Sequence, residues 1–223
     1  MAFVKTEVQG AVEIITIDRP KALNALNPEV LADLKAAFEA VDQSAIRCIV
    51  LTGEGDKSFV AGADIGSMST MTKAEGEAFG KLGNDVFLMI ESFPIPVIAA
   101  VNGFALGGGN ELAMSCDIRI CSDNAVFGQP EVGLGITPGF GGTQRLARLV
   151  GMGMAKQLVY SALNIKADEA YRIGLANAVY PQAELMENVL KLANKIAKNA
   201  PIAVRNCKKA INDGISLPIE KAV

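Results

Sequence analysis

Three consecutive glycines stand near the middle of this sequence, in Ala105-Leu-Gly-Gly-Gly-Asn-Glu-Leu-Ala-Met-Ser-Cys-Asp117. The apolar run 96–101 leads into them and predicts a buried strand that ends in a turn. Glycines carry no side chain, so the backbone at 107–109 can approach a ligand closely and point N–H groups at it. A helix beginning there would add the positive end of its dipole. We predict an anion-binding turn with a carboxylate, Glu111, three residues beyond Gly108, although three glycines alone would equally fit close packing of a helix on a strand.

The composition limits what kind of protein this chain can be. Its 223 residues, half of them apolar, suffice for one large domain with a buried core. The net charge is −3 and no basic block occurs, so we expect no nucleic-acid partner. No apolar run approaches the roughly 20 residues of a membrane span, and residues 1–10 lack the pattern of a signal peptide. We therefore expect a cytoplasmic protein with no membrane partner.

Histidine is absent from the chain. Its absence excludes a Ser–His–Asp triad, a Cys–His pair and a His-ligated metal site. The four cysteines (48, 116, 121 and 207) lack the spacing of a metal site, and we interpret them as reduced thiols in the core. Catalysis, if any, must then come from carboxylates, lysine, tyrosine or the backbone, and we predict no metal and no cofactor.

Strand and helix patterns alternate along most of the chain. Strands are predicted at 12–18, 48–51, 96–101, 118–121 and 176–180, and helices at 28–42, 73–91, 152–162, 167–173 and, broken near Pro201, at 182–214. Asp64 is interpreted as a helix N-cap, Asp117 and Arg119 as a structural polar pair, and Tyr160 and Tyr171 as packing residues. This order predicts an α/β domain with helices at its C-terminal end.

Six collinear segments carry a resemblance to a known family. They are Arg19-Pro-Lys-Ala-Leu-Asn-Ala-Leu26, Phe59-Val-Ala-Gly-Ala-Asp64, Pro96-Val-Ile-Ala-Ala-Val-Asn-Gly103, Ala105-Leu-Gly-Gly-Gly109, Phe127-Gly-Gln-Pro-Glu131 and Thr137-Pro-Gly-Phe-Gly-Gly-Thr-Gln144. Together they resemble the enoyl-CoA hydratase/isomerase (crotonase) superfamily, and most closely its bacterial short-chain hydratases. The resemblance implies an α/β fold, a crotonase-like spiral of ββα units with a C-terminal helical region, and assembly as a homotrimer or dimer of trimers.

The same resemblance implies a division of the chain into two parts. Residues 1–200 would form the spiral core, and residues 201–223 the start of the helical region used for trimerisation. Residues 213–218 look like a turn into a further helix, and 219–223 like its first turn. We therefore expect the helical region to be truncated at Val223.

The resemblance also implies the site residues. The catalytic carboxylates would be Glu111 and Glu131, and the backbone N–H groups of Ala63 and Gly108 would form an oxyanion hole. The acyl-CoA substrate, whose coenzyme A is not a separate cofactor, would lie against Lys21, Ala22, Leu23, Ala61, Ala63, Asp64, Ile65, Gly66, Gly108 and Gly139. One residue departs from the pattern, because Asn110 stands where many relatives carry cysteine.

The implied activity is that of a lyase of fatty acid metabolism. It adds water reversibly across the 2,3 double bond of a short-chain enoyl-CoA to give a 3-hydroxyacyl-CoA, with Glu111 as the base that orients the water and Glu131 as the acid that delivers the α-proton. An enoyl-CoA isomerase or another crotonase-type enzyme is the alternative, and a non-catalytic acyl-CoA or RNA-binding member is a third interpretation. Taken singly, Glu111 fits a first-turn glutamate and Glu131 a solvated loop carboxylate, so the catalytic interpretation rests on the joint pattern.

Overall fold

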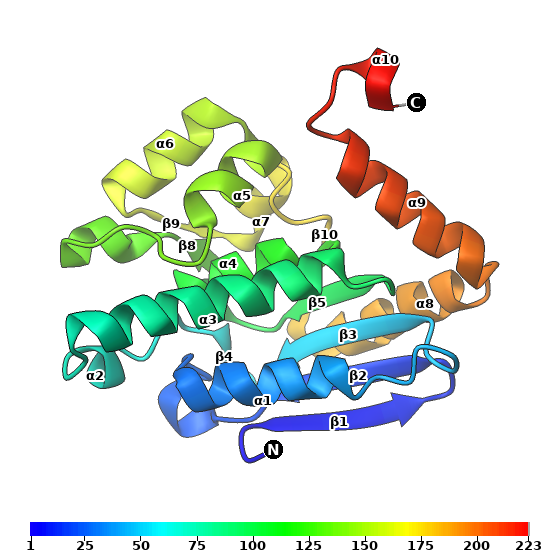
Figure 1. Ribbon diagram of the computed structural model, residues 1–223, viewed down its shortest axis with the longest axis horizontal. Coiled ribbons are helices and arrows are strands. Elements are labelled where there is room, and N and C mark those ends of the chain that lie inside the picture. The colour runs from blue at the N-terminus through cyan, green and yellow to red at the C-terminus, as the bar shows by residue number, and fades with distance from the viewer. Residues whose placement is uncertain (223) are drawn as a thin grey trace.

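The computed structural model describes residues 1–222 as two sheets surrounded by helices (Figure 1). The larger sheet contains, in spatial order, β1 (Val4–Gln9), β2 (Val12–Ile17), β3 (Cys48–Gly53), β5 (Val97–Val101), β7 (Ile118–Ser122) and β10 (Ala178–Tyr180). The smaller sheet contains β4 (Ser58–Val60), β6 (Phe104–Leu106), β8 (Val126–Gly128) and β9 (Asn164–Lys166). Neighbouring strands are parallel except for the pairs β1–β2 and β8–β9.

Successive strands enter the two sheets in turn. Strands β3, β5 and β7 join the larger sheet, and the strands that follow them, β4, β6 and β8, join the smaller one. Each such pair is followed by helical structure, namely α2 (Ile65–Met68) and α3 (Lys73–Ser92), α4 (Gly108–Ser115), or the 3-10 helix η2 (Pro130–Leu134) and α5 (Gly142–Val150). This repeated order confirms the predicted spiral of ββα units.

The smaller sheet brings three distant segments to one edge. Strands β4, β6 and β8 are adjacent and parallel, so their carboxyl ends lie at the same edge. The segments that leave this edge are 61–64, 107–108 and 129–131. The edges where parallel strands end are common places for ligand sites, because loops from several strands converge there.

The larger sheet is covered on both faces, and β2 shows how its sequence achieves this. Side chains of a strand alternate between faces. Ile15 and Ile17 join the main core, to which α1 (Pro28–Glu39) and α3 contribute. Val12 and Ile14 join a second core formed with α8 (Leu185–Ala197). Helix α1 begins as predicted, with Asn27 Oδ1 accepting from the N–H of Val30 at 2.9 Å, but it ends three residues earlier than predicted.

The last helices, α9 (Pro201–Gly214) and α10 (Ile219–Ala222), extend away from the sheets (Figure 1). Lys208 of α9 holds the carboxylate of Asp117, with Nζ 2.7 Å from Oδ2. The predicted pairing of Asp117 with Arg119 is therefore wrong. Arg119 instead donates to the carbonyls of Leu175 at 2.7 Å and Cys116 at 2.8 Å. Lys208 lies 91 residues beyond Asp117, so local spacing could not reveal this pair.

The predictions for three further residues are wrong. Tyr160 on α6 (Met152–Ser161) and Tyr171 on α7 (Ala167–Arg172) are 71% and 57% exposed, because other residues of these helices face the core. Cys207 on α9 is exposed, whereas the other three cysteines are buried as predicted. Among residues 1–222, every helix is too short or too polar to cross a membrane.

Candidate active site

The start of α4 presents a backbone N–H group to a cavity. Gly107 has φ 50° and ψ −120°, a conformation that side chains disfavour, and it turns the chain from β6 into the helix. Gly108 is the first helical residue, so its N–H has no partner within the helix. Among the described residues no hydrogen bond uses this N–H. Gly109 lies against β4, where an added Cβ would fall 1.8 Å from the carbonyl oxygen of Val60.

A second free N–H group belongs to Ala63. The segment that follows β4 is held by the loop of residues 19–26: Leu26 donates to the carbonyl of Gly62 at 2.8 Å, and Asp64 donates to the carbonyl of Leu26 at 2.7 Å. These two bonds engage the carbonyl of Gly62 and the N–H of Asp64. The N–H of Ala63, which lies between them, has no acceptor among residues 1–222. Ala63 and Gly108 both line the same cavity. Two unpaired donors there can bind an oxyanion.

Glu111, one turn into α4, is buried with 1% of its surface exposed. Its Oε1 accepts from the N–H groups of Phe140 at 2.9 Å and Gly142 at 2.7 Å. Burial raises the pKa of Glu111 to about 7, and the charge of Glu131 acts in the same direction, while the two N–H donors oppose the rise. A carboxyl group whose pKa is near neutral can exchange protons at physiological pH.

Glu131, in η2, is the second buried carboxyl group of the site. Its Oε1 accepts from Nε2 of Gln129 at 3.0 Å, whereas Oε2 has no partner among the described residues. Burial raises its pKa as well. Because two ionised carboxylates near each other repel, the pair favours a state with one proton.

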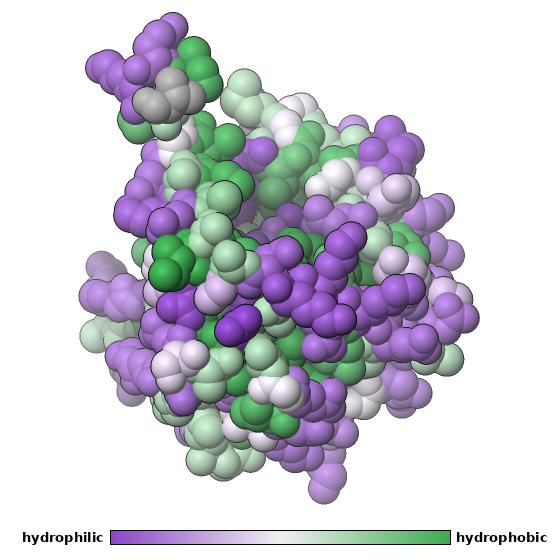
Figure 2. All heavy atoms as spheres, turned by 90° about the vertical axis from the view of Figure 1, so that its right-hand side faces the viewer, coloured by the Kyte–Doolittle hydropathy of each residue, from purple (hydrophilic) through white to green (hydrophobic). Residues whose placement is uncertain are grey.

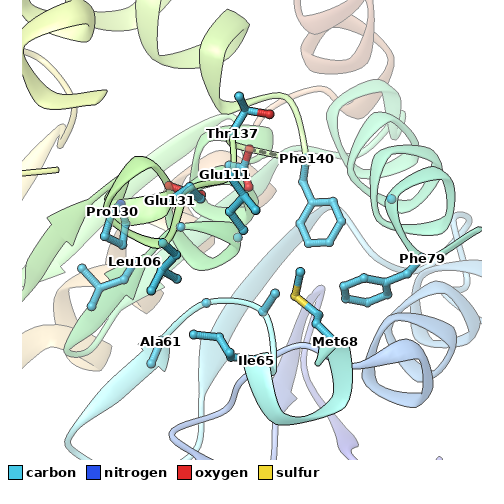
Figure 3. Close-up of a pocket in the computed structure, with 18 of the residues that line it drawn as sticks. Ala61, Ile65, Met68, Phe79, Leu106, Glu111, Pro130, Glu131, Thr137 and Phe140 are labelled. Carbon is cyan, nitrogen blue, oxygen red and sulfur yellow. Dashed lines mark hydrogen bonds between the residues drawn. The ribbon is translucent and has the colours of Figure 1, made fainter. Parts of the chain in front are cut away.

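The cavity has a volume of about 290 Å³ and a largely apolar lining. Glu111 and Glu131 lie on one of its walls, and Ala61, Ile65 and Met68 lie on the opposite wall (Figure 3). Such a space suits a small apolar group with one polar end that meets the carboxyl groups and N–H donors.

Aromatic side chains close one end of this cavity. Phe140 makes edge-to-face contacts with Phe79 and Phe87 of α3, at centroid distances of 5.3 and 5.4 Å. Gly83 of α3 makes room for the ring of Phe140, since an added Cβ would lie 2.4 Å from Cε1 of that ring. The phenylalanines thereby fix the turn whose N–H groups hold Glu111.

The structure brings together the two predicted carboxylates, both predicted N–H donors and some of the predicted substrate residues. Those that line the cavity are Ala61, Ala63, Ile65, Gly108 and Gly139.

The other predicted substrate residues lie outside its lining. Lys21 and Leu23 border a separate hollow beside Asp56 and Lys57, and Ala22 lies in the 3-10 helix between them, η1 (Pro20–Ala22). Asp64 accepts from the N–H of Ser67 at 3.2 Å, which confirms the predicted N-cap, and pairs with Arg19 at 2.7 Å. Gly66 follows in α2. Their contact with a substrate stays a prediction.

Two polar residues beside the carboxylates were not predicted as part of the site. Gln129 donates to Glu131, and Asn110 Nδ2 donates to Oε1 of Gln129 at 2.9 Å. Asn110 was singled out only as a departure from the family pattern. Gln129 lies two residues before Glu131, but only the turn into η2 shows that the amide reaches the carboxyl group.

Known proteins match this chain along nearly its whole length. The family model for enoyl-CoA hydratase/isomerase matches residues 7–223. The short-chain-enoyl-CoA hydratase of Clostridium acetobutylicum is 61% identical over 218 residues, which are 97% of this chain and 84% of that protein.

Solved structures match as well. The crystal structure of an enoyl-CoA hydratase from Bacillus anthracis is similar with a TM-score of 0.97 and 39% identity, covering 99% of this chain and 86% of that one. A structure from Thermobifida fusca, solved in complex with CoA, is similar with a TM-score of 0.91 and 32% identity, covering 99% and 88%. The chain therefore belongs to the enoyl-CoA hydratase/isomerase family.

Proposed function

We propose that this protein is an enoyl-CoA hydratase that adds water reversibly to short-chain 2-enoyl-CoA thioesters. The observation that carries the proposal is the placement of two buried carboxyl groups, Glu111 and Glu131, in one apolar cavity with two unpaired backbone N–H groups. The named relative from Clostridium acetobutylicum and the CoA complex from Thermobifida fusca support the choice of substrate.

The two N–H groups would stabilise charge on the thioester. As water attacks the β-carbon, negative charge builds on the thioester oxygen, and the N–H groups of Ala63 and Gly108 can donate to it. The dipole of α4 favours the same charge, because Gly108 is its first residue. Loss of one donor of this kind typically lowers a rate by about 10²–10³.

The two carboxyl groups would carry the proton transfers. Glu111 takes a proton from the attacking water, and Glu131 gives a proton to the α-carbon. Each such contribution is typically worth about 10²–10⁴ in rate. Burial raises the pKa of Glu111 to about 7 and also raises the pKa of Glu131, so the pair can share one proton near neutral pH.

A direct assay tests the proposed activity. Purified protein is mixed with crotonyl-CoA, and the ultraviolet absorbance of the conjugated thioester is followed. We expect the absorbance to fall as 3-hydroxybutyryl-CoA forms, and to rise when the reaction is started from that product. Unchanged absorbance in both directions, with folded protein, would contradict the proposal.

The pH dependence of hydration should report Glu111. Protonated Glu111 cannot accept a proton from water, so kcat/KM is expected to fall as the pH decreases below about 7, approaching tenfold per pH unit. Initial rates with crotonyl-CoA between pH 5 and 9 measure this. The acidic limb should disappear in Glu111→Gln, and a wild-type profile that stays flat to pH 5 would remove Glu111 from the role of base.

We also propose that no metal or redox cofactor takes part. The chain has no histidine, and coenzyme A belongs to the substrate. Hydration rates before and after exhaustive dialysis against a chelator should agree within about twofold. An activity that is lost on chelation and restored by one particular metal would overturn this.

We also propose that the protein assembles with copies of itself, as a trimer or a dimer of trimers, and acts in the cytoplasm. The segment beyond residue 200, with α9, α10 and the turn between them, exposes apolar side chains, and Figure 2 shows the molecule from that side. The large exposed ones are Ile202, Ile211, Ile215, Leu217 and Ile219. Clusters of this kind on a surface commonly mark an interface. A cytoplasmic location agrees with four cysteines that form no disulfide.

The interface prediction has a simple test. Ile215 is 77% exposed. We expect Ile215→Glu to shift the protein to smaller species in sedimentation velocity, because burying a charge in an apolar interface lowers the association constant several-fold. Lys191→Glu on α8 serves as a matched control for added negative charge. Equal sedimentation of Ile215→Glu and wild type would place the interface elsewhere.

A further inference from the structure

Two buried polar atoms near the site lack partners. Within residues 1–222 these are Oδ1 of Asn110 and Oε2 of Glu131, and no other buried side-chain nitrogen or oxygen shares this property. Both belong to one chain of hydrogen bonds, in which Asn110 donates to Gln129 at 2.9 Å and Gln129 donates to Glu131 at 3.0 Å. Asn110 is 1% exposed and Gln129 is fully buried, so solvent does not compete for these contacts.

The hydrogen bonds from Asn110 through Gln129 to Glu131 all run in one direction, from donor to acceptor. A primary amide donates from its nitrogen and accepts on its oxygen. Because the oxygen of Gln129 receives the N–H of Asn110, its nitrogen must face Oε1 of Glu131. If both amides were turned over, the oxygen of Gln129 would face Oε1, and two acceptors would meet unless Glu131 carried its proton there.

We propose that Asn110 is a positioning residue that acts through Gln129 and holds the carboxyl group of Glu131 by its Oε1. Asn110 fixes the direction of the Gln129 amide, so Nε2 of Gln129 donates to Oε1 of Glu131. Oε2 is buried and has no partner, so among the described residues the Gln129 amide is the only side-chain donor to this carboxyl group. The inference rests on the proposed hydratase function and assigns the residue that orients the donor to its acid.

In the proposed acid step, the O–H bond of the Glu131 carboxyl group breaks while the α-carbon–hydrogen bond forms, and the electron pair of the broken bond stays on Glu131. The water oxygen bonds to the β-carbon and gives one proton to Glu111. Passage of that proton from Glu111 to Glu131 restores the starting state.

Few other charged side chains lie near Glu131. Glu111 of α4 faces Glu131, and Arg145 of α5 acts on Glu111. Helix α6 packs against η2 and carries Lys156 and Tyr160, and neither forms a hydrogen bond or ion pair with Glu131 in the described part of the chain. The Gln129 amide is thus the side chain of the described residues that holds the Glu131 carboxyl group by a hydrogen bond.

Asn110→Leu tests the inference, because leucine matches asparagine in size but cannot donate. We expect kcat for crotonyl-CoA to fall about tenfold, the order of one hydrogen bond to an ionisable group, with KM within about twofold. The alkaline limb of kcat/KM, which would report loss of the proton from Glu131, should move to higher pH. Without Asn110 the Gln129 amide is no longer held with its N–H toward Oε1, and that donor favours the ionised form of Glu131. Asn110→Cys keeps a weak donor and should restore most of the rate.

A double-mutant cycle separates positioning from packing. If Asn110 acts through Gln129, the variant Asn110→Leu/Gln129→Leu should have the same kcat as Gln129→Leu alone. Ser115→Ala removes another buried polar group of α4 and serves as the control, with an unchanged pH profile. Additive losses in the cycle, or an alkaline limb that stays in place in Asn110→Leu, would overturn the inference. If wild-type protein does not hydrate crotonyl-CoA, the hydratase proposal itself has failed. If wild type is active but the variants behave otherwise than expected, only the role of Asn110 is wrong.

Discussion

Replacing Glu111 or Glu131 by glutamine is expected to lower the hydration of crotonyl-CoA by at least about 10²-fold in each case. Glutamine keeps the size and most hydrogen bonds of glutamate but can neither accept nor deliver the proton in these steps. The rate of the double variant should fall by much less than the product of the two single losses, because both groups act on the same water and share one proton. Steady-state rates of the three variants beside wild type measure this.

Binding and isomerisation provide the controls for these variants. Affinity for a saturated acyl-CoA should change little, since neither substitution alters the apolar walls of the cavity. If the protein is mainly an isomerase, Glu111→Gln should spare double-bond migration while Glu131→Gln abolishes it. Full hydratase activity in Glu111→Gln would show that the water lies elsewhere.

Gly109→Ala is expected to destabilise the fold by about 3 kcal/mol or more. A Cβ at this position would lie 1.8 Å from the carbonyl oxygen of Val60, a backbone atom that cannot rotate away. Helix α4 and strand β4 would have to separate, and this would also displace the N–H groups of Ala63 and Gly108. Chemical denaturation gives the free energy of unfolding, and the hydration rate of the folded fraction reports the displaced donors.

Gly153→Ala is the matched control for this loss. Gly153 also lies in a helix, α6, but an added Cβ would meet no atom within 4 Å. Alanine there should leave stability unchanged or raise it by up to about 1 kcal/mol, because alanine favours helix more than glycine does. If Gly109→Ala unfolds at the same denaturant concentration as Gly153→Ala, α4 and β4 do not pack as closely as described.

Local patterns predicted five of the six strands of the larger sheet and the long helices, because the apolar pattern of each reflects its own burial. Strand β1 was not predicted, and neither were the four three-residue strands of the smaller sheet, since a strand of three residues is too short to show a pattern. The run 96–101 is apolar throughout, and β5 is buried on both faces, as parallel strands between two helical layers must be. Asn27 and Pro28 marked the start of α1 through their own hydrogen-bonding properties. The ion pair of Asp117 with Lys208 was not predicted. It depends on where α9 packs against the rest of the fold, and no local sequence pattern shows that.

The site was predicted less completely than the fold. Glu111 and Glu131 could be identified as a pair only from the family resemblance, and their roles stay predictions. The sequence gives no sign that burial raises the pKa of both groups, because each is covered by segments distant in the chain. The link from Asn110 through Gln129 depends on side-chain geometry between α4 and the turn before η2, so residue types alone could not reveal it.

The alternating entry of strands into two sheets makes the site modular. Ala63 follows β4, Gly108 and Glu111 follow β6, and Glu131 follows β8, so three successive repeats each deliver part of the proposed site to the same edge. Since each part sits on its own connection, one can be exchanged without rebuilding the other two. A change after β8 would alter the proposed acid while both N–H donors stay in place. Under the proposed mechanism, the architecture thus separates recognition of a thioester oxygen from the choice of chemistry performed beside it.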